Sequence, residues 1–169
     1  MRDARGFSLI ELLITIAIAA ALTAIAILGT EGIRTGYKVR GATRLVYGDM
    51  QMARLMALKE GKEMAVEFVS ATAYCIKRKT GANWDPGCDI GGEDTLDVIR
   101  KTVDLSGDYS GVTALNVVYG NRVNFMSNGT AGATANVNPI TLQKGTRTQS
   151  LCLTTGTGRM RVVDGISCS

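Results

Sequence analysis

The most constraining feature of this sequence is an apolar stretch near its start, Phe7 to Leu28, which reads FSLIELLITIAIAAALTAIAIL. It has 22 residues, a single charge at Glu11, and neither proline nor glycine. A helix of that length spans about 33 Å, close to the roughly 30 Å of the hydrocarbon core of a bilayer. We therefore expect Phe7–Leu28 to form a helix that can cross a membrane.

The six residues before this stretch are too few to fold, and they include two arginines, Arg2 and Arg5. Positive charge beside an apolar segment favours the cytoplasmic side of a membrane. We therefore expect the N-terminus to stay in the cytoplasm and the chain after Leu28 to lie outside it.

The order Gly6-Phe7-Ser8-Leu9-Ile10-Glu11 resembles the class III signal of type IV pilins and of the pseudopilins of type II secretion. The resemblance implies that residues 1–6 are a leader peptide, that a prepilin peptidase cuts between Gly6 and Phe7, and that the new Phe7 amine is methylated. It also implies that Glu11 acts in assembly with other subunits, and that the chain starts in the inner membrane with a periplasmic domain.

Two simpler interpretations of the apolar stretch compete with this one. An ordinary secretory signal would be cut after a small-residue site such as Ala24-Ile25-Ala26, but the apolar core here is too long and contains a glutamate. A plain membrane anchor has little reason to keep Glu11, because an ionised residue at the bilayer centre costs about 2.5–3.5 kcal/mol on insertion scales.

Glu11 has a physical role under the pilin interpretation. After cleavage it lies one helical turn from the Phe7 amine, and a carboxylate near a helix N-terminus is favoured by the helix dipole. In an apolar filament core, the positive N-terminus of a neighbouring subunit would neutralise it. The simpler alternative is that Glu11 only complements its own dipole and amine.

Residues 29–62 contain a second helical pattern. Apolar residues recur every three or four positions, at Val39, Ala42, Val46, Met50, Ala53 and Ala57. That spacing predicts an amphipathic helix with Arg40, Arg44, Arg54 and Lys59 on its polar face and a stop near Gly61. Glycines between Gly29 and Gly41 weaken the junction, so we expect the long helix to bend or be interrupted there.

After Lys62 the apolar period shifts toward two, which predicts strands. We expect them at Met64–Val69, Ala73–Lys77, Leu96–Val103, Val112–Val118, Arg122–Phe125, Ile140–Gln143, Gln149–Thr154 and Arg159–Val163. The predicted fold is α+β: a long N-terminal apolar helix continues into an amphipathic helix that packs on an antiparallel β-rich domain formed by residues 63–169. This is also the pilin plan that the resemblance implies.

The β-rich part carries a second resemblance. Val123-Asn124-Phe125 followed by Asn128-Gly129, then Ile140-Thr141-Leu142 and Gly158-Arg159-Met160-Arg161-Val162, is similar to the GspH/FimT-type branch of minor pilins and pseudopilins. The proline that is typical after the Phe strand of this branch is replaced here by Met126-Ser127.

The four cysteines, Cys75, Cys88, Cys152 and Cys168, all fall in the part expected to be exported, where disulfides persist. Four cysteines allow three pairings. We favour Cys75 with Cys88 and Cys152 with Cys168, because each pair is near in sequence and closes a short loop worth about 3 kcal/mol.

Neither an enzyme nor a metal or cofactor site is expected. The chain has no histidine, no Gly-x-Ser-x-Gly or Walker A pattern, and no closely spaced cysteine pair that would hold zinc. A calcium site at Asp89, Glu93 and Asp94 is conceivable, but the EF-hand spacing is missing and a solvated acidic loop is the better interpretation.

We therefore predict a structural subunit of a type IV pilus or a type II secretion pseudopilus. The alternative is a minor pilin that binds DNA, because Gly158-Arg159-Met160-Arg161 is similar to the C-terminal Gly-Arg-x-Arg of FimT-type minor pilins associated with DNA uptake. Arg159 and Arg161 on one strand face would form a phosphate-binding patch with Lys144 and Arg147. A solvated strand face is the simpler alternative, since the tail lacks aromatic residues that stack bases.

Overall fold

A computed structural model of the chain describes residues 7–82, 84, 88, 97–115, 122–133 and 139–168. The chain divides into two compact units, Met1–Thr35 and Gly36–Ser169. Helix α1 (Leu9–Glu60) begins in the first unit and ends in the second. Its backbone is helical at every glycine between Gly29 and Gly41, so the expected interruption is wrong. Glycine supplies the same main-chain hydrogen-bonding groups as other residues, and its cost of about 1 kcal/mol does not by itself end a helix.

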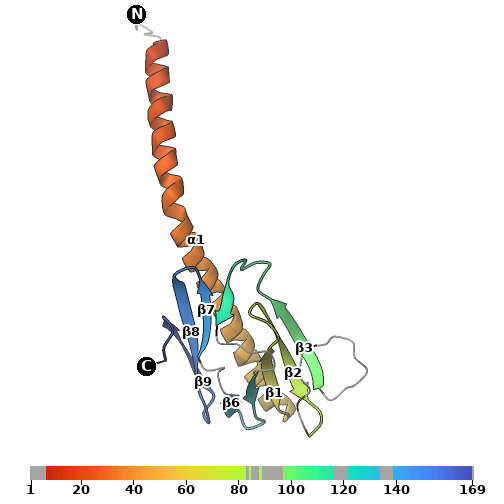
Figure 1. Cartoon of the computed structure of the whole chain (residues 1–169). Helices are drawn as coiled ribbons and strands as arrows, with labels where there is room; N and C mark the ends of the chain where they lie inside the picture. The colour runs from red at the N-terminus through yellow and green to blue at the C-terminus, as the bar shows by residue number, and fades with distance from the viewer. Residues whose placement is uncertain are drawn as a thin grey trace, which may run out of the picture. The chain divides into compact units, whose positions relative to one another are not determined.

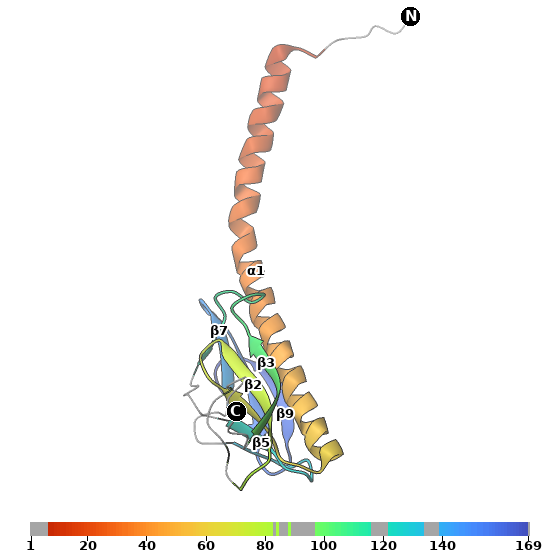
Figure 2. The same cartoon turned by 90° about the vertical axis from the view of Figure 1, so that its right-hand side faces the viewer.

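Among the described residues, the second unit has nine strands in two antiparallel sheets (Figure 1). The strands are β1 (Met64–Phe68), β2 (Ala73–Lys79), β3 (Asp97–Asp104), β4 (Thr113–Leu115), β5 (Arg122–Phe125), β6 (Ala131–Ala133), β7 (Ile140–Lys144), β8 (Arg147–Thr154) and β9 (Arg159–Asp164). The first sheet has the order β3-β2-β1-β5-β6, and the second has the order β4-β7-β8-β9. In Figure 2 the part of α1 that belongs to this unit lies along one side of the strands.

The core of the second unit is built on one stripe of α1. All six residues that the sequence predicts for this stripe are buried with an exposed fraction of at most 1%: Val39, Ala42, Val46, Met50, Ala53 and Ala57. They pack in one cluster with residues of the first sheet, such as Phe68 and Phe125, and of the second, such as Leu142 and Leu151. The predicted amphipathic helix and the α+β fold are therefore confirmed.

Most predicted strands are present with ends that differ by one or two residues, and Leu96, the predicted start of one strand, lies outside the described residues. Two strands differ more. Strand β6 was not predicted, because its sequence Ala-Gly-Ala has low strand propensity and too little side chain to show a period of two. It pairs with β5 through Phe125 and Ala131. Of the strand expected at Val112–Val118, β4 contains Thr113–Leu115, Val112 precedes it without being part of a strand, and residues 116–118 lie outside the described residues.

A buried polar group joins α1 to the first sheet. Asp49, which is nearly fully buried on α1, accepts a hydrogen bond from the Tyr74 hydroxyl at 2.8 Å and pairs with the Lys101 ammonium at 2.6 Å. Burial, followed by the hydrogen bond to Asp49, raises the pKa of Tyr74 above its usual value. The two contacts satisfy the buried carboxylate and fix α1 to β2 and β3.

Further along α1, Arg54 connects turns of both sheets. Its guanidinium donates to the Gly129 carbonyl at 2.9 Å, in the β5–β6 turn, and to the Thr157 and Gly158 carbonyls at 3.1 Å each, in the β8–β9 turn. The planar fork of arginine suits several convergent acceptors of this kind. This one side chain therefore holds two turns from different sheets against the helix.

Both disulfides have the pairing that the sequence favours. Cys75 on β2 is joined to Cys88, and Cys152 on β8 is joined to Cys168. Their Cα atoms are 5.9 and 5.7 Å apart, within the usual range for a disulfide. The second bridge fixes the chain that follows β9 back onto β8.

The close approach of the two turns gives a prediction for Gly158. Its φ is +67°, and a Cβ there would lie 2.8 Å from the Gly129 carbonyl oxygen. We expect Gly158→Ala to destabilise the fold by about 1–2 kcal/mol for the left-handed conformation and by a further 1–3 kcal/mol for overpacking. Thermal unfolding of the full chain in detergent measures this change.

Gly145→Ala is the matched control, because Gly145 has φ +57° and nothing within 4 Å of a built Cβ. It should show only the conformational cost. Equal losses of stability in the two variants would mean that contact between the turns does not constrain Gly158.

Candidate functional site

The first unit presents an apolar segment, Phe7 to Ile25, whose side chains are all exposed. From Phe7 to Ile25, no described side chain of this unit is buried or half-buried. The exposed fraction is 82% at Phe7, 77% at Leu9 and 70% at Ile25. A contiguous apolar surface of this size marks a site of association with a protein or a membrane.

Glu11 lies in the first turn of this helix, as the sequence predicts. The carbonyl of Ser8 accepts hydrogen bonds from the Glu11 and Leu12 amides at 3.1 and 3.2 Å, so Ser8 is the residue from which the helix starts. Ser8-Leu9-Ile10-Glu11 also has the spacing of a capping box, in which serine and glutamate satisfy the first amides of a helix. The carboxylate is therefore close to Phe7 along the chain and near the positive end of the helix dipole.

The predicted cleavage site falls at the edge of the described chain. Phe7 is exposed immediately before α1, whereas residues 1–6, and with them Gly6, lie outside the described residues. Cleavage after Gly6 and methylation of Phe7 therefore stay predictions. In the part of the chain that the structure describes, no helix combines the length and the apolarity required to cross a membrane.

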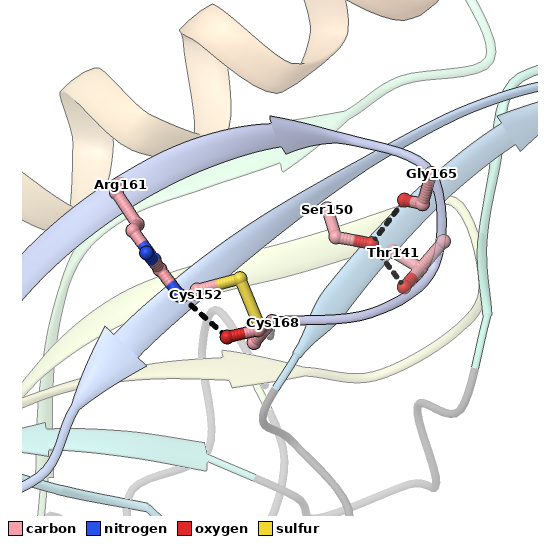
Figure 3. Close-up of a disulfide and its surroundings, with 6 residues drawn as sticks. All are labelled: Thr141, Ser150, Cys152, Arg161, Gly165 and Cys168. Atoms are coloured by element: carbon pink, nitrogen blue, oxygen red, sulfur yellow. Dashed lines mark hydrogen bonds between the residues drawn. A yellow bond between two sulfur atoms is a disulfide. The ribbon is translucent and has the colours of Figure 1, made fainter.

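The two C-terminal arginines lie on β9, at one edge of the second sheet. Arg159 pairs with Thr154 and Arg161 with Cys152, and both arginines are exposed. Residues two apart on a strand point to the same face, so they form a pair on one surface. Figure 3 shows the Arg161 guanidinium donating to the Cys168 carbonyl beside the Cys152–Cys168 disulfide. The bridge thus fixes the acceptor that holds Arg161.

Lys144 and Arg147 do not join this pair. They are cross-strand partners at the β7–β8 turn, where β8 begins, whereas Arg159 lies opposite the residue at which β8 ends. At about 3.4 Å per residue, the eight residues of β8 separate the two ends by about 24 Å. The four cations therefore form two separate pairs, one at each end of the second sheet.

A further group of charged residues lies on the face of the first sheet opposite the core. Lys77 and Glu67 form an ion pair at 2.6 Å, and their side chains are only 1% and 0% exposed. The ring of Trp84 lies 5.8 Å from the Lys77 and Lys79 ammonium groups and 5.5 Å from the Arg122 guanidinium, distances typical of cation–π contacts.

The Cys75–Cys88 disulfide lies at the same face of the first sheet. Cys88 is bonded to Cys75, which is the cross-strand partner of Glu67. Sequence reasoning missed the cluster because an isolated tryptophan and alternating charges do not reveal which strands will be neighbours. Lys77 and Glu67 neutralise each other, and the ring of Trp84 lies near the cations of this cluster. We therefore interpret the cluster as structural.

The structure does not test the calcium alternative, because Asp89, Glu93 and Asp94 lie outside the described residues. Within the described ranges no group of three or more histidine, cysteine, aspartate or glutamate side chains is arranged to hold a metal ion. Asp104, at the end of β3, is exposed and caps the following turn, and the hydrogen bond that it accepts from the Ser106 backbone lowers its pKa.

Comparison with known proteins identifies two family models. The model for the prokaryotic N-terminal methylation motif matches residues 1–27, which include Gly6, Phe7 and Glu11. The model for the type II transport protein GspH matches residues 42–159, which run from the buried helix stripe through both sheets to the start of β9. Searches of curated proteins and of solved structures gave no significant match. Because the second model covers more than half of the chain, the protein belongs to the GspH family and is type IV pilin-like.

Proposed function

We propose that this protein is a minor pilin or pseudopilin that is anchored in the inner membrane and then assembled into a filament through its N-terminal helix. The observation that carries the proposal is the exposed apolar helix from Phe7 to Ile25, which lies within the segment that the methylation-motif model matches. Its apolar surface is stabilised by burial, at about 25 cal/mol per Å². Lipid supplies that burial before assembly, and the helices of neighbouring subunits supply it afterwards.

The inferred processing follows from the same segment. A prepilin peptidase cuts between Gly6 and Phe7, the Phe7 amine is methylated, and the globular part stays on the periplasmic side. The basic residues Arg2 and Arg5 support a cytoplasmic N-terminus. The match to a type II transport protein favours a secretion pseudopilus over a type IV pilus.

In this proposal Glu11 selects the axial position of a subunit. An unpaired carboxylate is costly in an apolar filament core, and the cost falls when the charge meets an opposite one. The Phe7 amine of a neighbouring subunit is such a charge. Its pairing with Glu11 would fix the register of adjacent helices, which non-directional apolar burial alone cannot do.

A second candidate function is contact with DNA through Arg159 and Arg161. Their exposure on one face of β9, next to the Cys152–Cys168 bridge, favours a preorganised phosphate contact. The distance along β8 argues for a contact by this pair rather than by the four-residue patch that the sequence predicts.

Processing gives the first prediction of this proposal. The mature chain should begin with methylated Phe7, which mass spectrometry of membrane-extracted protein detects. Gly6→Val should leave the leader attached, if the peptidase requires a small residue before the cut. A mature chain that begins at Ile27, or an intact Met1, would contradict the pilin assignment.

Assembly gives the second prediction. Glu11→Leu should insert and be processed normally, because removing a charge eases insertion, but its level in filaments should fall tenfold or more. The reason is that a neighbour's buried amine left without its counter-charge costs about 3–5 kcal/mol. Quantitative immunoblotting of sheared filaments measures incorporation.

Thr15→Val is the matched control for Glu11→Leu. It makes a polar residue apolar one turn further along the same helix without changing a charge, and it should assemble normally. Normal filament levels for Glu11→Leu would show that pairing with the Phe7 amine is not required.

The DNA alternative gives a separate prediction. In a salt series with duplex DNA, each neutralised phosphate contributes about −0.9 to the slope of log K against log salt. Replacing both Arg159 and Arg161 by glutamine should make the slope less negative by about 1.8 and weaken binding to all sequences alike. The matched double variant at Lys144 and Arg147 should leave the slope unchanged. No measurable binding by the native chain would leave only the structural role.

A further inference from the structure

Each of the two sheets of the second unit has two edge strands, and these four edges differ among the described residues. The edge of β4 is capped, because the Ala114 amide donates to the Ala71 carbonyl at 2.7 Å. The edge of β6 is capped too, because the Ala131 carbonyl accepts a hydrogen bond from the Gly156 amide at 2.8 Å. Strand β3 has an irregularity in its register with β2, which twists an edge away from a further strand. In the described part of the chain, β9 has neither device.

The backbone groups that β9 turns outward follow from its register with β8. The Gly165 amide donates to the Thr148 carbonyl at 3.2 Å, so these two residues form a hydrogen-bonded pair. Hydrogen-bonded and non-hydrogen-bonded pairs alternate along an antiparallel ladder. Every second residue of β9 therefore turns its N–H and C=O groups away from β8: Met160, Val162 and Asp164. Within the described ranges no other backbone group bonds to them, so β9 presents an edge to which a further strand can add.

The same edge leaves apolar surface uncovered. Met160 lies opposite Leu153, and Val162 lies opposite Leu151, so both side chains share the face of the second sheet that contains the core. Met160 packs against the core, whereas Val162 is 42% exposed. A further strand beside β9 would cover Val162 and continue the core face of the sheet.

The opposite face of β9 carries positive charge. Arg159 and Arg161 are exposed there, and none of the ion pairs within the described residues includes either of them. Acidic side chains on an added strand would lie across from these arginines, and opposite charges in cross-strand pairs are stabilising. The edge therefore favours a strand that alternates apolar and acidic residues.

The chain that follows β9 does not lie along this edge. The Ser150 hydroxyl donates to the Gly165 carbonyl at 2.6 Å, and Cys168 is bonded to Cys152 (Figure 3). Ser150 and Cys152 both belong to β8, so these contacts hold the tail on β8 and not along the outward side of β9. The described part of the tail thus leaves the edge open to another chain.

We propose that β9 is a docking edge for an extended segment of a neighbouring filament subunit, which adds to the four-stranded second sheet as a further strand. The inference rests on the assembly proposed above. Main-chain hydrogen bonds to the outward groups of β9 supply affinity, and alternate side chains supply specificity. The added strand places apolar side chains beside Val162 and acidic ones across from Arg159 and Arg161. The N-terminal helix supplies burial without direction, whereas this edge selects which subunit lies beside the domain.

Hydrogen exchange at single residues tests this proposal with the full chain. When the chain is a monomer in detergent, the amides of Met160 and Val162 should exchange rapidly, whereas those of Arg161 and Val163, which face β8, should exchange slowly. In isolated filaments the exchange of the Val162 amide should slow about tenfold or more, because an added strand then holds it in a hydrogen bond. Mass spectrometry with fragmentation along the backbone measures these rates.

A proline at the edge tests the same contact through assembly. Val162→Pro removes an outward N–H and leaves the ladder to β8 intact, so thermal unfolding should show a folded domain. Its level in filaments should fall about fivefold or more, the factor that corresponds to one lost backbone hydrogen bond. Val162→Lys is a second variant that keeps the backbone unchanged. It should fold, because Val162 is partly exposed, and should also be depleted from filaments, because an added strand would bury its charge.

Thr102→Pro is the matched control on the edge of β3. The Leu105 amide donates to the Thr72 carbonyl at 2.8 Å, so the same alternation turns the Thr102 N–H away from β2. This variant loses an outward N–H at an edge that the proposal does not use. It should enter filaments at the level of the native chain.

The outcomes separate this inference from the proposed function. A native chain that is absent from filaments overturns the assembly and the inference with it. A chain that enters filaments, but whose Val162 amide exchanges as fast there as in detergent, overturns only the docking edge, as do normal filament levels of both Val162 variants. A Val162 amide that already exchanges slowly in detergent means that the edge is covered within the chain or by a second copy, which also overturns the proposal.

Discussion

The fold of the second unit depends on one apolar stripe of α1. Its six buried residues from Val39 to Ala57 are valine, alanine and methionine, and both sheets share a single core with them. Polar contacts then fix the register: Asp49 holds Tyr74 and Lys101, and Arg54 holds turns of both sheets. Apolar burial supplies most of the stabilisation and has no direction, whereas these few contacts decide where each strand lies along the helix.

The parts of the fold that the sequence predicts well are those with a strong local period. The buried stripe follows the helical repeat, and most strands alternate in hydropathy, so their positions can be derived residue by residue. Strand β6 has no such signal, because Ala-Gly-Ala gains its conformation from pairing with β5. The sequence places Arg54 on the polar face of the helix but does not reveal its carbonyl partners, which come from residues more than seventy positions away.

The candidate sites show the same limit. Sequence reasoning placed Glu11 in the first turn of the helix, since that position depends only on local order. It grouped Lys144 and Arg147 with Arg159 and Arg161 because all four lie in the basic tail. The register of β8 separates them, and instead Lys144 meets Lys38 at Ser110, a neighbour that only the tertiary fold provides.

The Arg54 contacts also have a mechanical meaning. In the filament proposed above, a subunit held by its helix would receive tension along the axis of α1. The guanidinium is joined to three carbonyls from two turns, and Asp49 adds two more bonds to the first sheet. Sliding the helix past the strands would load these bonds together, in shear, rather than one after another. The same contacts that fix the fold therefore make the domain resist extension along its helix.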